Sequence, residues 1–361
     1  MLIIDAHLDL SMNALQWDRD PLASVYTIRT REQQVLGKGR GVGTVAFPEM
    51  RSGRVALSFA TLLARSTGKA VPHLDFDSPT QAFGMAWGQI GYYRALERAG
   101  ALRVVTGAAD LDEHWAAWER WESGGARAGS EPSLGIIVSM EGADPILDPE
   151  QLPVWFDAGL RAIGLTHYGP GRYAGGTGTE TGLTDLGRAL LPEMRRLGVL
   201  CDLTHMSDRA FWETLELYDG PVLASHNNCR ALVPHQRQFS DDQIRAIAER
   251  DGVIGAAMDV WMVASGWTYN DLGGRAVTLS DVVDHIEHIR KVTGSARNVA
   301  IGTDLDGGFG REQSPTDLDT IADLQKLPAL LRERDFTDDE IAAVCHGNWL
   351  RLLRSTWNAR G

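Results

Sequence analysis

The chain has 361 residues, of which 43% are hydrophobic and 23% are charged, and this excludes collagen-like, coiled-coil and disordered chains. A formal net charge of −13 argues against a nucleic-acid-binding surface, since such a surface carries an excess of Lys and Arg. No apolar run approaches the roughly 20 residues of a membrane-spanning helix, and the first residues lack the features of a signal peptide. Three cysteines without CxxC spacing do not indicate a disulfide framework. We therefore expect a cytoplasmic protein that binds neither nucleic acid nor membranes.

Short apolar runs alternate with amphipathic stretches along the chain. The runs are β-branched or nearly continuous in apolar residues, as expected of parallel strands that are buried on both faces. Eight runs are predicted as strands: residues 2–6, 55–62, 134–140, 161–166, 199–204, 221–225, 253–258 and 298–303. A ninth run at residues 102–105 is short, and we expect an accessory strand there.

Several of the intervening helices have recognisable ends. One is predicted to stop before Gly198, a residue type that suits the position after a helix. Ser240 and Gln243 have the spacing of a capping box at the start of another. His285 and His288 lie on a later predicted helix, and we expect both at the surface.

The alternation of strands and helices predicts an α/β fold, namely a (β/α)8 TIM barrel of the metal-dependent hydrolase type. A doubly wound sheet would give a similar alternation. The barrel is favoured because most predicted strands end in a histidine or an acid, and barrel enzymes build their sites at the carboxyl ends of the strands. Without a linker or a repeat in the sequence, we expect a single domain over residues 1–361, with helices at its C-terminus.

Histidines and carboxylates follow the predicted strands. His7 and Asp9 are two residues apart, so that both side chains point to the same side of an extended segment. Glu141 closes an apolar run, where a carboxylate is costly to bury unless it is paired or metal-bound. His205 and His226 end two further runs. A structural role would explain any one of these residues, but it does not explain all five together.

Nitrogen and carboxylate ligands without a thiolate suit zinc, with manganese, cobalt or iron as alternatives. Five protein ligands are too many for one catalytic zinc, which usually takes three ligands and water. A carboxylate that bridges two ions would accommodate all five, with a hydroxide held between the ions. The sequence therefore predicts two Zn²⁺ per chain, bridged by Glu141.

Eight sequence motifs resemble those of the renal (membrane) dipeptidase family within the amidohydrolase superfamily. In chain order they are IIDAHLDL, SMEGAD, IGLTHYG, DLTHMS, ASHNNCRAL, HQRQFSDDQIRAIAERDGVIG, IGTDLDG and GNWLRLL. The resemblance implies a (β/α)8 barrel with a binuclear zinc centre. It assigns His7 and Asp9 to the first ion, Glu141 to the bridge, and His205 and His226 to the second ion.

The same resemblance implies three further roles. His167 would polarise the scissile carbonyl, Arg237 would bind the terminal carboxylate of the substrate, and Asp304 would act as general acid and base. Asp306 lies two residues after Asp304 and is the second choice for that role, or an orienting group. The sequence also departs from the family pattern, because Tyr168 stands where an asparagine is common and His7-Leu-Asp replaces the usual HND.

The resemblance thus implies a metallo-dipeptidase that hydrolyses L-Xaa-L-Xaa dipeptides, L-Xaa-D-Xaa dipeptides or both with a metal-bridging hydroxide. The alternative is a related amidohydrolase that acts on N-acyl amino acids, lactones or cyclic amides. A barrel that binds metal without catalysis is disfavoured, because the acid/base Asp304 is present. The expected partner is a dipeptide substrate, and a symmetric homodimer is the default assembly.

Overall fold

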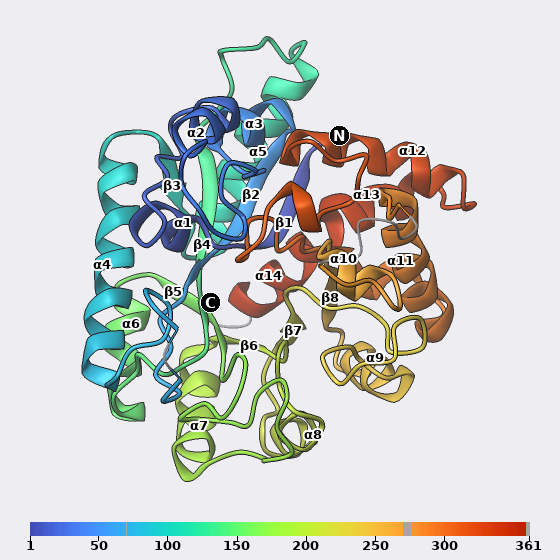
Figure 1. Cartoon of the computed structure of the whole chain (residues 1–361). Helices are drawn as coiled ribbons and strands as arrows, with labels where there is room; N and C mark the ends of the chain where they lie inside the picture. Colours follow the sequence, from blue (N-terminus) through green and yellow to red (C-terminus); the bar gives the residue numbers. More distant parts are fainter. Residues whose placement is uncertain (70, 270–275, 359–361) are drawn as a thin grey trace.

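The structure is a computed structural model that describes residues 1–361 except 70, 270–275 and 359–361. Within these residues, parallel strands form a ring, and helices surround the ring on its outside (Figure 1). Neighbouring strands follow the order β1–β2–β4–β5–β6–β7–β8–β9. Their bounds are β1 (Ile3–Leu8), β2 (Val55–Leu62), β4 (Leu134–Glu141), β5 (Leu160–Gly164), β6 (Leu200–Asp202), β7 (Val222–Ala224), β8 (Val253–Ala256) and β9 (Val299–Ile301). The predicted α/β barrel is confirmed.

The ring closes between its last strand and its first. Just after β9, the backbone N–H of Asp304 donates to the carbonyl of His7 at 3.3 Å. In the same segment, a Cβ on Gly302 would collide with the carbonyl oxygen of Ser225, so that only glycine allows this close approach. The closure thus brings the segment after β9 beside the ends of β1 and β7.

The accessory strand is also confirmed. β3 (Leu102–Val104) pairs in parallel with the first residues of β4, from Leu134 to Ile136. The later residues of β4, from Val138 to Glu141, pair with β5. β3 and β5 therefore pair with different parts of β4, β3 with its first residues and β5 with its last.

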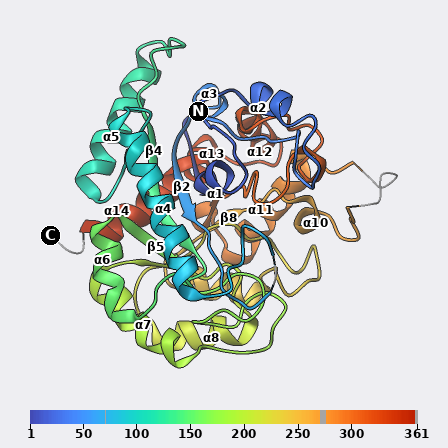
Figure 2. The same ribbon diagram turned by 60° about the vertical axis from the view of Figure 1, so that its left-hand side comes forward.

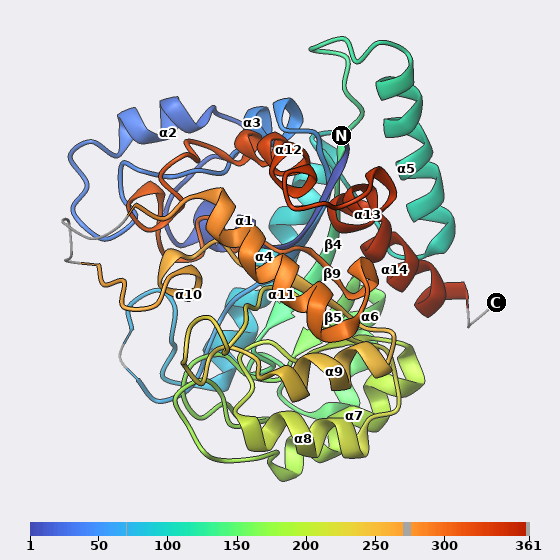
Figure 3. The same ribbon diagram turned by 90° about the vertical axis from the view of Figure 1, so that its right-hand side faces the viewer.

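Helices cover the outside of the ring, and Figures 2 and 3 show them from two further directions. Helices α6, α7 and α8 follow one another around one side (Figure 2), and α11 lies beside α9 on another (Figure 3). The longer helices are α4 (Pro79–Arg98), α5 (Ala108–Ser123), α7 (Asp185–Leu197), α8 (Asp208–Leu217), α9 (Asp241–Glu249), α11 (Leu279–Thr293) and α14 (Asn348–Asn358). The shorter ones are α1 (Leu10–Leu15), α2 (Val25–Arg31), α3 (Phe47–Ser52), α6 (Leu152–Asp157), α10 (Val260–Val263), α12 (Leu327–Arg332) and α13 (Asp338–Ala342). In the part of the chain that is described, no helix has the length and apolar character needed to cross a bilayer.

Two predicted helix ends are confirmed. Gly198 follows α7 with a left-handed φ of 62°, which glycine adopts without strain. At the start of α9, the Gln243 side chain accepts from the backbone N–H of Ser240 at 2.9 Å, and the Ser240 hydroxyl accepts from the N–H of Gln243 at 3.3 Å. This is the predicted capping box.

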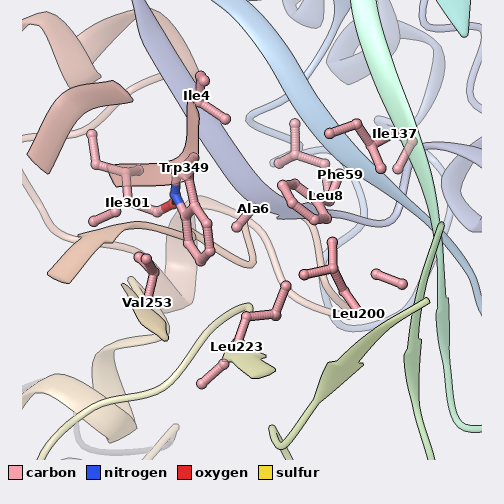
Figure 4. Close-up of a cluster of buried hydrophobic side chains, with 14 of the residues drawn as sticks. Ile4, Ala6, Leu8, Phe59, Ile137, Leu200, Leu223, Val253, Ile301 and Trp349 are labelled. Atoms are coloured by element: carbon pink, nitrogen blue, oxygen red, sulfur yellow. Dashed lines mark hydrogen bonds between the residues drawn. The ribbon is translucent and has the colours of Figure 1, made fainter. Parts of the chain in front are cut away.

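An apolar cluster centred on Trp349 of α14 joins side chains from seven of the strands (Figure 4). The indole Nε1 of Trp349 donates to the carbonyl of Ile301 at 2.9 Å, and its ring lies 5.6 Å from that of Phe59. We call this the Trp349 cluster; its members, all fully buried, are Ile4, Ala6, Leu8, Phe59, Ile137, Leu200, Leu223, Val253, Ile301 and Trp349.

The prediction for α11 is wrong at His285. This side chain is fully buried, whereas His288 on the same helix is partly exposed and lies 2.8 Å from Asp241 Oδ1. The backbone N–H of Cys229 donates to Nδ1 of His285 at 3.1 Å, and Nε2 lies 3.0 Å from the carbonyl oxygen of Val263. Burial is possible because both ring nitrogens have backbone partners.

Candidate functional site

Histidine and carboxylate side chains converge where the strands of the ring end. His7 lies near the end of β1 and Asp9 directly follows that strand, while Glu141 is the last residue of β4. His205 follows β6 and His226 follows β7. We call these five residues the His–carboxylate cluster. The structure brings all five predicted ligands to the same end of the ring.

Oε1 of Glu141 is the point at which the imidazoles meet. It lies 3.3 Å from Nε2 of His205, 3.4 Å from that of His226 and 3.6 Å from that of His7. Nε2 of His167 is 3.7 Å away. The Nε2 atoms of His205 and His226 are only 3.2 Å apart. Imidazole nitrogens and a carboxylate that face each other at these distances are the donor set of a cation site.

The electrostatics of the cluster favour a bound cation. Burial raises the pKa of Glu141 well above its usual range, and the carboxylates of Asp9 and Asp304 add to this shift. Burial likewise lowers the pKa of His205 and His226 well below the usual value. The histidines are therefore neutral, as metal ligands must be. A divalent cation would also stabilise the ionised form of the Glu141 carboxylate.

An orphaned nitrogen supports the fit to metal. Nε2 of His7 is buried and has no hydrogen-bond partner among the described residues. Buried polar atoms rarely lack a partner, because an unpaired one costs free energy. The ligand atoms of three groups lie close enough together to hold an ion: His7, Glu141 and His226; Glu141, His167 and His205; His7, Asp9 and Asp304. The residues present therefore fit a metal centre.

Unusual backbone conformations shape the ends of the strands. His205, Asp304 and Asp306 have φ values of 67°, 61° and 62°. Residues with a side chain rarely adopt this left-handed region, and each instance costs of order 1–3 kcal/mol. The hydroxyl of Thr177 holds His205 in place, since it donates to the His205 carbonyl at 3.2 Å and lies 3.0 Å from its Nδ1. Such strain is typical of functional sites.

The two aspartates after β9 point to different places. Oδ1 of Asp304 lies 3.7 Å from Nε2 of His7, and burial raises the pKa of Asp304 well above its usual value. Asp306 instead accepts from the backbone N–H of Thr44 at 2.7 Å and pairs with Arg19 at 3.5 Å. Asp304 thus faces the His–carboxylate cluster, whereas Asp306 holds the segment before α3.

His167 stands beside the cluster, three residues after β5. Its Nδ1 lies 2.9 Å from NH1 of Arg65, and its Nε2 faces Glu141. The ring of Tyr168 lies 4.9 Å from those of both His167 and His205. Arg65 was not predictable from the sequence, because it belongs to no motif and reaches the site from the segment after β2.

Arg237 is deeply buried at 2% exposure, although the polar segment around it resembles a surface loop. Its NH2 donates to the carbonyl of His226 at 2.9 Å, and its NH1 donates to the side-chain oxygen of Asn227. Its Nε has no partner among the described residues. Both of these partners are neutral, and among the described residues no carboxylate lies within ion-pair distance of the guanidinium. Its charge acts at longer range on Glu141 and Asp304, where it opposes the rise in pKa.

A cavity of about 200 Å³ lies above the cluster. This is smaller than the roughly 300–1,000 Å³ of pockets for drug-sized ligands, and it therefore suits a small substrate. Its lining includes Asp9, Arg65, Glu141, His167, Tyr168, His205, Arg237, Asp259, Met262 and Asp304. Asp259 was not identified from the sequence. Burial raises the pKa of Asp259 to about 6, and its carboxylate accepts from Trp261 Nε1 at 2.6 Å and Gln313 Nε2 at 2.7 Å.

Comparisons with known proteins agree on one family. The sequence pattern of the family described as membrane dipeptidase (peptidase family M19) matches residues 1–360. The crystal structure of a metallopeptidase from Rhodobacter sphaeroides, liganded with a phosphinate mimic of the dipeptide L-Ala-D-Ala, aligns over 99% of both chains with a TM-score of 0.76 and 25% identity.

Two curated sequences are similar as well. An uncharacterized protein from the pqqA 5′ region of Klebsiella pneumoniae is 29% identical over 77% of this chain and 98% of its own length. Dipeptidase aclJ of Aspergillus oryzae is 32% identical over 56% of this chain and 46% of its own length. The match thus spans about half of the Aspergillus protein.

Proposed function

Because the chain belongs to the membrane dipeptidase family of metallopeptidases, peptidase family M19, we propose that it hydrolyses dipeptides with two zinc ions held by the His–carboxylate cluster. The observation that carries this proposal is the convergence of imidazole nitrogens on a single oxygen of Glu141, at 3.3–3.6 Å within the cluster. A single carboxylate that is shared in this way can serve two ions.

The ligands divide into two sets. His7 and Asp9 would hold one ion, His205 and His226 the other, and Glu141 both. Nitrogen and oxygen donors without a thiolate suit zinc. When bound, the ions supply Lewis acidity, which lowers the pKa of water toward neutrality and polarises a carbonyl.

Asp304 is proposed as the proton carrier. It lines the cavity, faces His7 and is not needed to complete either set of ligands. Its carboxylate would accept a proton from the attacking water and give it to the amine that leaves when the peptide bond breaks.

His167 and Arg237 are proposed to orient the dipeptide. His167 would donate a hydrogen bond to the carbonyl oxygen as negative charge develops on it. Arg237 would bind the free C-terminal carboxylate, because its buried guanidinium contacts only neutral groups of the described chain. A clamp on that carboxylate next to a cavity of about 200 Å³ would restrict the substrate to two residues.

The relative from Rhodobacter sphaeroides, which was crystallised with a mimic of L-Ala-D-Ala, supports the view that a D-residue is accepted at the second position. We therefore expect this chain to cleave both L-Xaa-D-Xaa and L-Xaa-L-Xaa dipeptides. The alternative substrates are N-acyl amino acids, lactones and cyclic amides.

The decisive experiment compares free dipeptides with their C-terminal amides and with the alternative substrates. Zinc-reconstituted protein is assayed with L-Ala-D-Ala, L-Ala-L-Ala, their C-terminal amides, N-acetyl-L-alanine, a lactone and a cyclic amide. We expect close to two zinc ions per chain and cleavage of the free dipeptides. The Arg237→Met variant should lose kcat/KM on the free dipeptides by the equivalent of roughly 2–5 kcal/mol, with little loss on the amides.

The matched control is Arg245→Met, since Arg245 is an exposed arginine that pairs with Asp242. It should leave all rates unchanged. The dipeptidase proposal fails if protein with two bound zinc ions cleaves none of the dipeptides, and the role of Arg237 fails if acids and amides lose activity equally.

A further inference from the structure

We propose that Arg65 is a positioning residue that fixes the tautomer of His167, so that His167 presents a protonated Nε2 to the cavity. This inference deepens the proposed function and rests on it for its catalytic meaning. The tautomer itself is a property of the protein that can be observed without any substrate.

The side chains of Arg65 and His167 are in direct contact. NH1 of Arg65 lies 2.9 Å from Nδ1 of His167. A guanidinium group can only donate hydrogen bonds and keeps its charge at any pH the protein tolerates. Nδ1 must therefore accept, and in a neutral imidazole the single proton then resides on Nε2.

The other histidines near Glu141 have a different kind of partner. Nδ1 of His205 lies 3.0 Å from the hydroxyl of Thr177, and Nδ1 of His226 lies 2.9 Å from that of Ser225. The Ser225 hydroxyl is also 3.4 Å from Nδ1 of His7. A hydroxyl can accept from an Nδ1–H, which leaves the lone pair of Nε2 free for a metal ion.

The direction of such a hydrogen bond, from Nδ1–H to the hydroxyl oxygen, is clearest at Thr177. Its hydroxyl proton is directed to the carbonyl of His205 at 3.2 Å, so its oxygen is available to accept from Nδ1 of the same histidine. Three histidines beside hydroxyls are thus suited to bind metal. His167, beside an arginine, is suited to donate instead, although its Nε2 is almost as close to Glu141 as theirs.

Arg65 is itself held firmly. Its NH2 lies 3.3 Å from Oδ2 of Asp75, and that carboxylate accepts from the backbone N–H of Thr67 at 2.8 Å. The backbone of Arg65 donates to the carbonyl of Leu74 at 2.9 Å and accepts from the N–H of Phe76 at 2.8 Å. Its charge is matched by Asp75, which distinguishes it from Arg237 and argues against a second clamp for the substrate carboxylate.

The test reads the protonation of the ring nitrogens directly. Zinc-loaded protein labelled with ¹⁵N-histidine is studied by long-range ¹H–¹⁵N NMR, and the His167 signals are assigned by their loss in His167→Gln. In the wild type we expect an unprotonated Nδ1 and a protonated Nε2. In Arg65→Met, which removes the donor, the Nδ1–H form should become populated, and Arg65→Lys should restore the wild-type pattern.

Kinetics provide a second readout. Arg65→Met should lower kcat on L-Ala-D-Ala by about 10²–10³-fold, as the loss of an oxyanion donor does, with little change in KM. Arg65→Lys should recover much of this loss. A rise in KM on free dipeptides but not on their amides would instead make Arg65 a carboxylate clamp and overturn the proposal.

The proposal is also overturned if Nδ1 of His167 is protonated in the wild type, a result that does not depend on any Arg65 variant. It fails equally if the tautomer is unchanged in folded Arg65→Met. If the tautomer behaves as expected but no dipeptide is cleaved, the proposed function fails while the assignment of the tautomer holds.

Discussion

On strand β4, Ile137 and Glu141 lie four residues apart and both are buried, yet they belong to clusters of opposite character. Ile137 packs in the Trp349 cluster, where burial of each large apolar side chain contributes about 1.5–3 kcal/mol to stability. Glu141 lies in the His–carboxylate cluster, where burial raises the pKa of its carboxyl and penalises the charged form. The same pattern recurs on β7, where Leu223 precedes His226.

This difference implies that the apolar side chains of the strands stabilise the fold, whereas the titratable side chains at and just after the strand ends are costly to bury. Only a cation that neutralises the carboxylates would offset this cost. Substitutions in the Trp349 cluster should therefore change stability, whereas substitutions in the His–carboxylate cluster should change metal content and activity.

The largest effect is expected from Glu141→Gln. Glutamine keeps the size of the side chain but cannot serve as an anionic bridge, so both ions should be lost. Activity should fall by more than the 10²–10⁴-fold typical of a missing acid or base. The check is elemental analysis together with kcat on L-Ala-D-Ala.

The same variant also tests, in the metal-free protein, whether burial of the Glu141 carboxylate is destabilising. Because the carboxylate of Glu141 is penalised by burial, its replacement should leave the free energy of unfolding of metal-free protein at pH 8 unchanged or higher. A variant that retained two zinc ions, or a metal-free variant much less stable than the wild type, would contradict this view of the cluster.

The second-largest effect is expected from Asp304→Asn. Asparagine has the shape of aspartate but cannot accept a proton from water, so kcat should fall by about 10²–10⁴-fold while zinc content stays near two. Loss of one ion would make Asp304 a ligand, as its distance of 3.7 Å from Nε2 of His7 also allows.

The neighbouring Asp306→Asn provides the contrast. Asp306 accepts backbone hydrogen bonds from Thr44 and Val45 and pairs with Arg19. Its replacement weakens these hydrogen bonds, while Arg19 keeps its ion pair with Glu32 at 2.9 Å, so we expect lower stability with kcat largely retained. A reversed result, with activity lost only in Asp306→Asn, would exchange the roles of the two aspartates.

In the Trp349 cluster, Trp349→Ala should reduce the free energy of unfolding by about 3–5 kcal/mol, because it leaves a cavity and removes the donor to the Ile301 carbonyl. The protein that remains folded should still bind zinc. Trp212→Ala is the control, since Trp212 is 45% exposed and should cost little. Urea unfolding and zinc content measure the two effects separately.

The sequence was most informative about features that depend on residues within a single strand or helix. Buried parallel strands are apolar runs, and a polar residue at the end of such a run is visible without the fold. The closing of the barrel then brings residues as distant as His7 and His226 together, as the predicted barrel requires. The Ser240 capping box was predictable for the same local reason.

Features that depend on partners from distant segments were not predictable. Arg65 is an arginine without a motif until the fold places it beside His167. Asp259 directly follows the predicted strand at residues 253–258, so its place at a strand end was visible in the sequence, but its contact with Gln313 was not. His285 was assigned to the surface because the pattern of a helix does not show that the segment after β7 and helix α10 will each offer a partner to one ring nitrogen. The left-handed φ of His205 likewise has no signal in the sequence.

The smallest effect is expected at His285, a buried histidine that lies outside the His–carboxylate cluster. Burial lowers its pKa from 6.5 to about 4. Between these values the unfolded chain binds a proton that the folded chain excludes, so the free energy of unfolding falls as the pH falls from 6.5 to about 4. At about 1.36 kcal/mol for each pH unit, the contribution of His285 amounts to about 3 kcal/mol.

The His285→Gln variant should therefore be less stable than the wild type at pH 7, and the difference should shrink by about 3 kcal/mol on going to pH 4. Urea unfolding of the metal-free proteins measures this difference without interference from metal release. His288→Gln, on the same helix, leaves His285 in place and should keep the slope of the wild type. A difference between wild type and His285→Gln that is constant from pH 7 to pH 4 would mean that the folded protein accepts the proton on His285 freely. Such a result is incompatible with the hydrogen bond that Nδ1 accepts from the Cys229 N–H.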